Sequence, residues 1–259
     1  MKHAIQLPLT LLALVCVIHE TRGQSSASPA WKNYPVGEIE FINASPDTRG
    51  ARIYSAIIPE PVDYITRCAR EVLETLYYSP DDSLPDIRKI TYVLKEYDGI
   101  SAKSGRPPRV RIEYSTRWVE RSFGESDTAK LEHETRGVLY HELTHAFQLE
   151  PQGIGSYGTN KVFWAFIEGM ADAVRYVNGC FTEKDCPDGG SYMDGYRTTG
   201  FFLGWIAKTK KPDFLRAFNR STLEVIPWSF DGAIKHVLGK DQDIDTLWAE
   251  YQQARSRQE

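Results

Sequence analysis

Apolar and polar positions alternate in the first part of the chain and recur with a helical period in the second part. Residues 39–46, 87–99 and 109–120 alternate and are rich in β-branched or aromatic side chains, which predicts three strands. The stretch SAKSGRPP between the last two strands predicts a loop because Gly, Pro and Ser dominate it. Residues 61–78 begin with Pro61 and have an amphipathic period, so they predict a helix.

From residue 132 onward the spacing of apolar residues is typical of helices. A chain with strands first and helices afterwards favours an α+β domain. We therefore expect a small N-terminal mixed β-sheet followed by a mainly helical half. The predicted helices in that half are 133–149, 162–177, 195–208, 212–219, 229–238 and 244–256.

The first residues have the layout of a secretory signal peptide. Lys2 supplies a positive charge, residues 4–18 are uncharged and mostly apolar, and a polar stretch with small residues follows. The apolar run is too short to span a bilayer comfortably. We assign residues 1–23 as the signal peptide, with cleavage after Gly23 or after Ala27.

The remaining chain is predicted to form one domain. Residues 24–36 are rich in Ser, Ala and Pro and indicate a loose lead-in, so the domain proper is assigned to residues 37–259. No later segment is apolar enough to cross a membrane. We expect the mature protein to be secreted and extracellular, with no membrane attachment after the signal is removed.

The charge of the chain argues against one class of partner. The net charge is −4, and loss of residues 1–23 removes Lys2, Glu20 and Arg22, a net +1, which leaves −5. A negative chain has no electrostatic reason to bind nucleic acid.

Three cysteines remain after the predicted signal peptide, which carries Cys16. Cys180 and Cys186 are six residues apart and predict a disulfide that closes a small loop in an oxidising compartment. Cys68 lies in the predicted helix 61–78 and is expected to be a buried free thiol.

The segment GVLYHELTHAFQLE contains a possible metal-binding motif. His141 and His145 are four residues apart, so on a helix both imidazoles face the same side and can reach one ion. Two nitrogen ligands in this arrangement suit a tetrahedral Zn²⁺ site. Glu142 is offset around the helix, where it can take a proton from a water that the metal polarises.

A catalytic zinc needs a third protein ligand, and the helix 162–177 offers one. Glu168 and Asp172 share a face of this otherwise apolar helix, and buried carboxylates are costly unless they pair or bind a metal. We assign Glu168 as the third ligand and Asp172 as the acceptor that orients the ring of His141. The alternative is that one carboxylate pairs with Arg175 or another basic residue.

The combined motifs resemble a known family. HExxH followed by ExxxD resembles the gluzincin metallopeptidases, in which that glutamate is the third zinc ligand. The segments YHELTHAFQ, FIEGMADAVRYVNG, GYRTTGFFLGWI and DIDTLWAEYQ resemble the basic secretory protein family of peptidases from plants, fungi and bacteria, over most of residues 35–252. The resemblance implies a secreted, zinc-dependent protein with a zincin-like domain and a thermolysin-like pair of catalytic helices. The acidic charge of this chain departs from the family's name.

Peptide hydrolysis also needs a group that stabilises the oxyanion beside the metal. Tyr196 is the first candidate because it lies in the segment that resembles the family. Tyr157, Tyr192 and Arg197 are alternatives in nearby loops.

Three function classes fit these observations. The first is a secreted zinc metallopeptidase, expected to be a monomeric endopeptidase that acts on a peptide or protein substrate. The second is a secreted defence-type binding protein of the same fold, with a vestigial or structural zinc site. A structural site has no need of Glu142, which favours the first class. The third is a zinc hydrolase that acts on a non-peptide amide or ester, which the sequence does not separate from the first.

Overall fold

A computed structural model describes residues 28–123 and 127–257. The predicted signal peptide, residues 1–23, lies outside the described residues. The described part contains one four-stranded sheet and nine α-helices, with the strands in the first half of the chain. The predicted mixed sheet followed by a helical half is confirmed.

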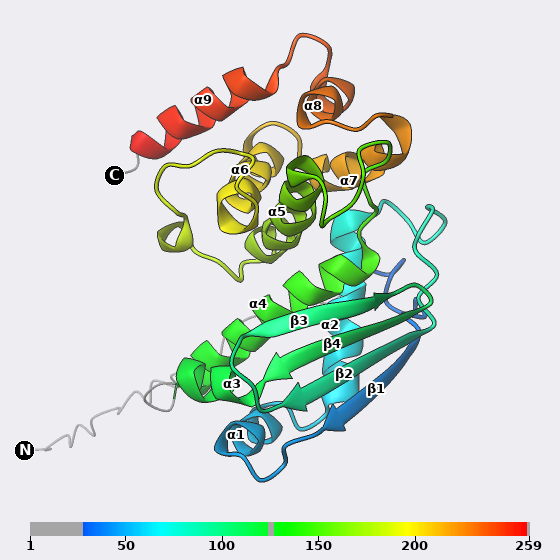
Figure 1. Ribbon diagram of the computed structural model, residues 1–259, viewed down its shortest axis with the longest axis vertical. Helices are drawn as coiled ribbons and strands as arrows, with labels where there is room; N and C mark the ends of the chain where they lie inside the picture. Colours follow the sequence, from blue (N-terminus) through cyan, green and yellow to red (C-terminus); the bar gives the residue numbers. More distant parts are fainter. Residues whose placement is uncertain (1–27, 124–126, 258–259) are drawn as a thin grey trace, which may run out of the picture.

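The sheet has the strand order β1-β2-β4-β3. Strands β1 (Glu38–Asn43), β2 (Lys89–Lys95) and β4 (Arg109–Ser115) are parallel, and β3 (Ser101–Arg106) pairs antiparallel with β4. Strand β3 therefore forms one edge of the sheet. This edge lies beside the helix that carries the histidine motif (Figure 1).

Two sequence predictions in this region are wrong. The segment predicted as a loop contains β3, whose side chains are mostly exposed and polar and so show no apolar alternation. The strand predicted for 109–120 ends at Ser115, and helix α3 (Thr116–Phe123) follows directly. The hydroxyl of Ser115 accepts a hydrogen bond from the backbone N–H of Trp118, which stabilises the start of this helix.

The helices that the sequence predicted begin and end within a few residues of their predicted limits. One further helix has no counterpart in the prediction. Helix α1 (Arg49–Ile57) was not predicted, and the hydroxyl of its N-cap Thr48 accepts from the N–H of Ala51. The remaining helices are α2 (Pro61–Leu76), α4 (Thr128–Phe147), α5 (Lys161–Val177), α6 (Tyr196–Thr209), α7 (Phe214–Glu224), α8 (Phe230–Leu238) and α9 (Ile244–Ser256), and a short 3₁₀ turn spans Glu183–Asp185.

Helix α4 lies between the sheet and the C-terminal helices, with α2 behind the sheet (Figure 1). Helices α5 and α6 lie side by side above α4, and α7, α8 and α9 surround them. The first described residues also join the core, since Trp31 and Val36 are buried. No helix in the described ranges has both the length and the apolar character needed to cross a membrane.

The predicted disulfide is absent, because all three cysteines in the described part of the chain are free. The Cys186 sulfur lies 3.2 Å from the hydroxyl of Tyr251 on α9, whereas Cys180 is buried. Proximity in sequence therefore does not bring the two thiols together. Cys68 is buried and free, as predicted.

Glycines allow α5 and α6 to approach closely. A Cβ atom added at Gly204 would lie 2.3 Å from the ring of Tyr176, and one at Gly200 would lie 2.8 Å from Cβ of Asp172. A Cβ atom on Gly169 would lie 2.3 Å from the side chain of Thr199. These contacts fix the distance between α5, which carries both predicted carboxylates, and α6.

We predict that Gly204→Ala lowers the free energy of unfolding by about 1–3 kcal/mol, because the added methyl group overpacks the contact with Tyr176. Helix propensity alone would favour alanine by about 1 kcal/mol. A net loss of stability would therefore show that the added methyl group overpacks the contact between the two helices. Urea unfolding measures the change.

Gly158→Ala is the matched control, since Gly158 is exposed and an added Cβ would meet nothing within 4 Å. It should change stability by less than about 0.5 kcal/mol. If Gly204→Ala is as stable as the control, α5 and α6 do not pack as described.

Candidate metal centre

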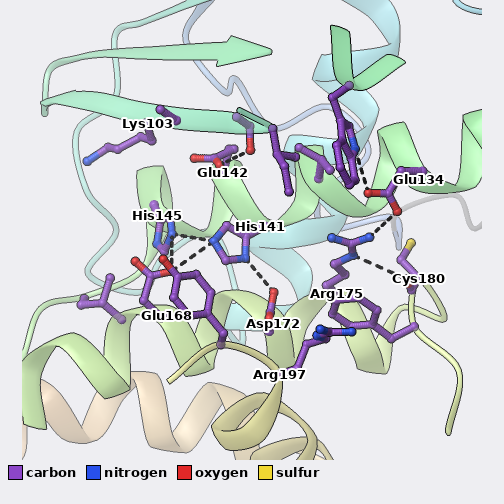
Figure 2. Close-up of a pocket in the computed structure, with 18 of the residues that line it drawn as sticks. Lys103, Glu134, His141, Glu142, His145, Glu168, Asp172, Arg175, Cys180 and Arg197 are labelled. Carbon is purple, nitrogen blue, oxygen red and sulfur yellow. Dashed lines mark hydrogen bonds and ion pairs between the residues drawn. The ribbon is translucent and has the colours of Figure 1, made fainter. Parts of the chain in front are cut away.

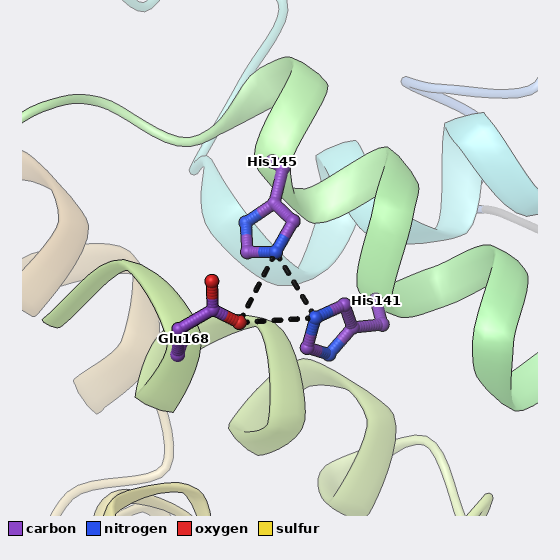
Figure 3. Close-up of side chains that lie close together, drawn as sticks. All are labelled: His141, His145 and Glu168. Carbon is purple, nitrogen blue, oxygen red and sulfur yellow. Dashed lines mark hydrogen bonds and ion pairs between the residues drawn. The ribbon is translucent and has the colours of Figure 1, made fainter. Parts of the chain in front are cut away.

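Helix α4 presents the two histidines of the motif on one side and packs on the core with the other. Asp127 caps its first turn by accepting from the N–H of Lys130. Leu139, Leu143 and Phe147 are buried. This anchoring leaves the histidine face of the helix directed at α5 (Figure 3).

Helix α5 brings the two carboxylates against that face. Its first N–H groups are capped by the side chain of Asn160. Glu168 and Asp172 are 4% and 5% exposed, so both carboxylates are buried although they lie one turn apart. Such a pair is stabilised only if positive groups or hydrogen-bond donors face it.

The three predicted ligand atoms form a compact triangle (Figure 3). His141 Nε2 lies 3.0 Å from His145 Nε2, and Glu168 Oε2 lies 3.3 Å from the former and 3.5 Å from the latter. Tetrahedral zinc with bonds of about 2.0–2.2 Å places neighbouring ligand atoms roughly 3.3 Å apart. The spacing of the triangle therefore fits one such ion.

One atom of the triangle also needs a partner that no hydrogen bond supplies. Glu168 Oε2 is buried and accepts no hydrogen bond in the described part of the structure. A buried carboxylate oxygen in this condition is costly, and a metal ion would satisfy it. Two imidazoles and a carboxylate are ligands that zinc accepts. His141, His145 and Glu168 thus form a group that could hold a metal ion.

The rings are held in place by further polar groups. Asp172 Oδ1 lies 2.7 Å from His141 Nδ1, so the predicted contact between them exists. Gln148 was not predicted, and its side-chain amide lies 2.8 Å from His145 Nδ1. Because an amide offers both a donor and an acceptor, it can hold the ring while Nε2 faces the other ligands.

The ionisable side chains that face each other on α4 and α5 shift each other's pKa values. Burial disfavours the charged form of His141, but the charge and hydrogen bond of Asp172, with Glu168, outweigh it and raise the pKa of His141 to about 10. Burial likewise opposes ionisation of Glu168, yet the imidazoles of His141 and His145, which face this carboxylate, lower the pKa of its carboxyl. A metal that binds His141 Nε2 must therefore displace a proton at neutral pH.

The second oxygen of the Glu168 carboxylate is also fixed. The hydroxyl of Tyr157 donates to Glu168 Oε1 at 2.6 Å from the loop between α4 and α5. This bond turns Oε2 toward the two histidines. Tyr157, predicted as an alternative oxyanion donor, thus lies beside the metal-binding group.

Glu142 lies next to the ligand triangle without belonging to it. Its carboxylate is 4% exposed, and Oε1 accepts from the hydroxyl of Ser101 at 2.5 Å. Ser101 begins the edge strand β3, so the sheet orients this carboxylate. Its place beside three ligands that it does not join is the arrangement expected for a general base.

A groove of about 1360 Å³ contains the ligand triangle and Glu142 (Figure 2). Tyr196 lines it from the first turn of α6 and lies parallel to the ring of His141, with 6.0 Å between the ring centres. Its φ of 41° is unusual for a residue other than glycine and indicates local strain of the kind found at functional sites. Arg197 also lines the groove, whereas Tyr192 does not and packs against Phe202, Phe230 and Trp248.

Arg175 does not pair with either carboxylate of the site, which removes Arg175 as the partner considered from the sequence. Its Nη2 lies 2.6 Å from Glu134 Oε2 on α4. The side chain crosses α4 at Gly137, where a Cβ atom would lie 2.5 Å from Arg175 Nε. This ion pair joins α4 to α5 at one end of the site.

Three groups around the site could not be assigned from motifs alone. Gln148 lies three residues after His145, so helical geometry could have indicated that it reaches the same ring. Ser101 and Tyr157 come from segments without a motif, and only the fold brings them to Glu142 and Glu168.

Comparison with known proteins places the chain in a family. Residues 36–251 match the BSP family, described as a peptidase of plants and bacteria, and the chain belongs to this family. No curated protein and no solved structure matches the chain.

We predict that the purified protein binds about one zinc ion per chain through the three ligands. Glu168→Ala, His141→Ala and His145→Ala should each abolish tight binding. Asp172→Asn keeps all three ligands but weakens the hold on the His141 ring, so affinity should fall about 10- to 100-fold. Competition with a chromogenic chelator measures these affinities.

His236→Ala is the matched control, because this histidine lies on α8 and pairs with Glu224. It should bind zinc as the unmodified protein does. Loss of all zinc from Asp172→Asn with retention in Glu168→Gln would reverse the roles assigned to the two carboxylates.

Proposed function

We propose that this member of the BSP family is a secreted zinc-dependent metallopeptidase with a zincin-like catalytic domain. The observation that carries the proposal is a ligand triangle at zinc spacing with a buried carboxylate beside it, in one groove. A site that only stabilised the fold would have no use for Glu142. The family description as a peptidase supports the same reaction.

His141, His145 and Glu168 would hold the zinc ion, which when bound lowers the pKa of a water and polarises the scissile carbonyl. Glu142 accepts the proton of the attacking water and later delivers it to the leaving amine. The hydroxyl of Ser101 occupies Oε1 of Glu142, so Oε2 is left for this proton. Asp172 and Gln148 keep the two imidazoles oriented.

Two phenols are available to stabilise the oxyanion. Burial, and then the negative charge of Glu168, raise the pKa of Tyr196, so its hydroxyl stays protonated at neutral pH and can donate. The hydroxyl of Tyr157 donates to Glu168, whereas the hydroxyl of Tyr196 has only the phenol of Tyr157 as a neighbour among the described residues. We therefore propose Tyr196 as the donor to a developing oxyanion.

The shape of the groove supports a peptide substrate. Residues of β3 line it, and this strand is the sheet edge with no further strand paired to it in the described structure. An extended peptide can add to such an edge through backbone hydrogen bonds. Pairing along β3 would engage the backbone of a chain and not one of its ends, which supports an endopeptidase.

The proposal also includes secretion, which rests on the sequence, and activity as a monomer. The pattern of residues 1–23 supports export, and the absence of charge suited to nucleic acid supports an extracellular peptide or protein as the substrate. In the described structure the site is complete within one chain, which supports activity as a monomer.

We predict that Glu142→Gln abolishes cleavage of a broad peptide library, with turnover reduced at least about 10²-fold, while zinc content is unchanged. The amide cannot accept the proton but leaves all three ligands in place. Mass spectrometry of the digest measures cleavage, and the zinc-depleted protein is the second comparison.

Cleavage by neither the unmodified protein nor its zinc-reconstituted form would contradict the peptidase proposal. Tight zinc binding combined with intact peptide binding would then favour the binding protein of the same fold.

We predict that Tyr196→Phe lowers kcat about 10- to 100-fold with little change in KM, because its hydroxyl acts on the oxyanion and not on the bound substrate. Tyr157→Phe should instead weaken zinc binding, since it frees Glu168. Steady-state kinetics at saturating zinc separates the two. An unchanged kcat for Tyr196→Phe would remove this residue from the mechanism.

A further inference from the structure

The chain is packed against α2 from Ser28 onward, before the first strand begins. The carbonyl of Ser28 accepts from the backbone N–H groups of Trp31 at 2.9 Å and of Lys32 at 3.0 Å, which forms a turn. Trp31 is 1% exposed, and the backbone carbonyl of Tyr34 accepts from Nε of Arg70 on α2 at 3.1 Å. Part of the segment predicted as a loose lead-in is therefore fixed to the core.

The backbone nitrogen of Ser28 bonds to a carboxylate of the same helix. Glu74 Oε2 on α2 accepts from Ser28 N at 3.0 Å, although the two residues are 46 positions apart in the chain. Arg216 donates to the backbone carbonyl of Glu74 and not to its carboxylate. None of the ion pairs between described residues involves Glu74. Ser28 N is thus in contact with a carboxylate that has no cationic partner in the described part of the chain.

The charge of Glu74 also acts on a second carboxylate of α2. Burial is the main cause that raises the pKa of Glu71, and the negative charge of Glu74 acts in the same direction. The positive charges of Arg136 and Arg67 oppose this shift, yet the pKa stays raised. Side chains three residues apart share a helix face, so the two negative charges oppose each other. A positive charge at Ser28 N would offset this repulsion.

The bond before Ser28 has the sequence of a signal cleavage site. Ala27 and Ser25 are the first and third residues before this bond, and both are small, as in the cleavage sites of secretory signal peptides. Ala27 itself lies outside the described residues. Cleavage after Gly23, the other site that the sequence left open, would keep Ser28 inside the chain with a neutral N–H. Cleavage after Ala27 would turn the same nitrogen into the α-amino group of the mature protein.

We propose that a peptidase of the export pathway cleaves the chain after Ala27 and that the new α-ammonium group of Ser28 forms an ion pair with Glu74. Hydrolysis breaks the bond between the carbonyl carbon of Ala27 and Ser28 N. The oxygen of one water joins that carbon to give a carboxylate, and both protons of the water pass to the nitrogen. An α-amino group is mostly protonated at neutral pH. The charge-assisted bond is about twice as strong as the neutral N–H bond that it replaces.

The ion pair would fasten the N-terminal segment to a helix that supports the metal-binding group. Helix α2 packs on α4, where the hydroxyl of Tyr140 donates to Glu71 next to His141 in the chain. The precursor has a neutral N–H at Ser28, so the ion pair would form only after export. This inference rests on the export that is part of the proposed function, and it requires neither zinc nor peptide cleavage.

The first measurement identifies the N-terminus of the exported protein. The full chain is produced in a secreting host with its own first 27 residues, and mass spectrometry of the intact protein in the medium gives its first residue. We expect Ser28 with a free α-amino group. A mature protein that begins at Gln24, or at any residue other than Ser28, would overturn the proposal.

The second measurement tests the ion pair by urea unfolding of the mature protein. Glu74→Gln should raise the equilibrium constant for unfolding about 3- to 10-fold, because it removes the negative charge from a half-buried pair. Acetylation of the α-amino group at mildly acidic pH, where lysines are protonated and unreactive, should have a similar effect. Since both changes remove the same interaction, their combined effect should be smaller than the product of the two.

Glu132→Gln is the matched control. Glu132 is exposed on α4, and no hydrogen bond or ion pair between described residues involves it. Its substitution should change the unfolding constant less than about 2-fold in the free and in the acetylated protein. A Glu74→Gln effect no larger than that of the control, or one that is equal in the free and the acetylated protein, would show that the ion pair does not form.

Failure of this inference and failure of the proposed function give different results. A protein that is exported with another first residue would remove the N-terminal ion pair and leave the proposed secretion and peptidase activity intact. A protein that stays in the cell with residues 1–27 attached would contradict export as well. Peptidase activity is measured separately by comparison with Glu142→Gln, so a protein that begins at Ser28 but cleaves no peptide would contradict only the peptidase proposal.

Discussion

The structure depends on the opposition of two imidazoles on α4 and two carboxylates on α5. Glu168 and Asp172 are buried one turn apart, and an unpaired buried carboxylate costs several kcal/mol. His141 contacts both of them, and His145 contacts Glu168. The two helices can pack closely only because these groups face each other. The same packing leaves Glu168 Oε2 without a hydrogen bond at the point where three ligand atoms converge.

Contacts at the ends and flanks of α4 and α5 hold the two imidazoles against the two carboxylates. The ion pair of Glu134 and Arg175 joins the same two helices at one end, and it fits because Gly137 has no side chain. Behind α5, glycine contacts hold α6 close and bring Tyr196 over His141. On the other side, the sheet edge supplies Ser101 to the carboxylate of Glu142. The side chains that line the groove therefore come from separate parts of the fold that meet at α4.

Much of the site could be predicted because its groups are spaced by helical geometry. The positions i and i+4 of His141 and His145, and of Glu168 and Asp172, determine which side chains share a face before any tertiary contact is known. The long amphipathic helices were also recognisable, since their apolar faces are buried in one core. Their limits differed from the prediction by a few residues because caps such as Asp127 act through single hydrogen bonds.

The parts that could not be predicted depend on long-range contacts. Strand β3 has polar, mostly exposed side chains and is a strand only because β4 pairs with it. Ser101 and Tyr157 carry no local signal, and their roles arise from bonds to residues 41 and 11 positions away. The disulfide prediction failed for the same reason: spacing along the chain does not determine the direction of two thiols, and Cys186 points at Tyr251.

We propose that His141, His145 and Glu168 bind one zinc ion. Anomalous diffraction at the zinc absorption edge, from crystals of the protein prepared with zinc, would locate the ion. We expect a single strong peak within bonding distance, about 2.0–2.2 Å, of His141 Nε2, His145 Nε2 and Glu168 Oε2. A map without a peak there, or with zinc held only by other residues, would contradict it.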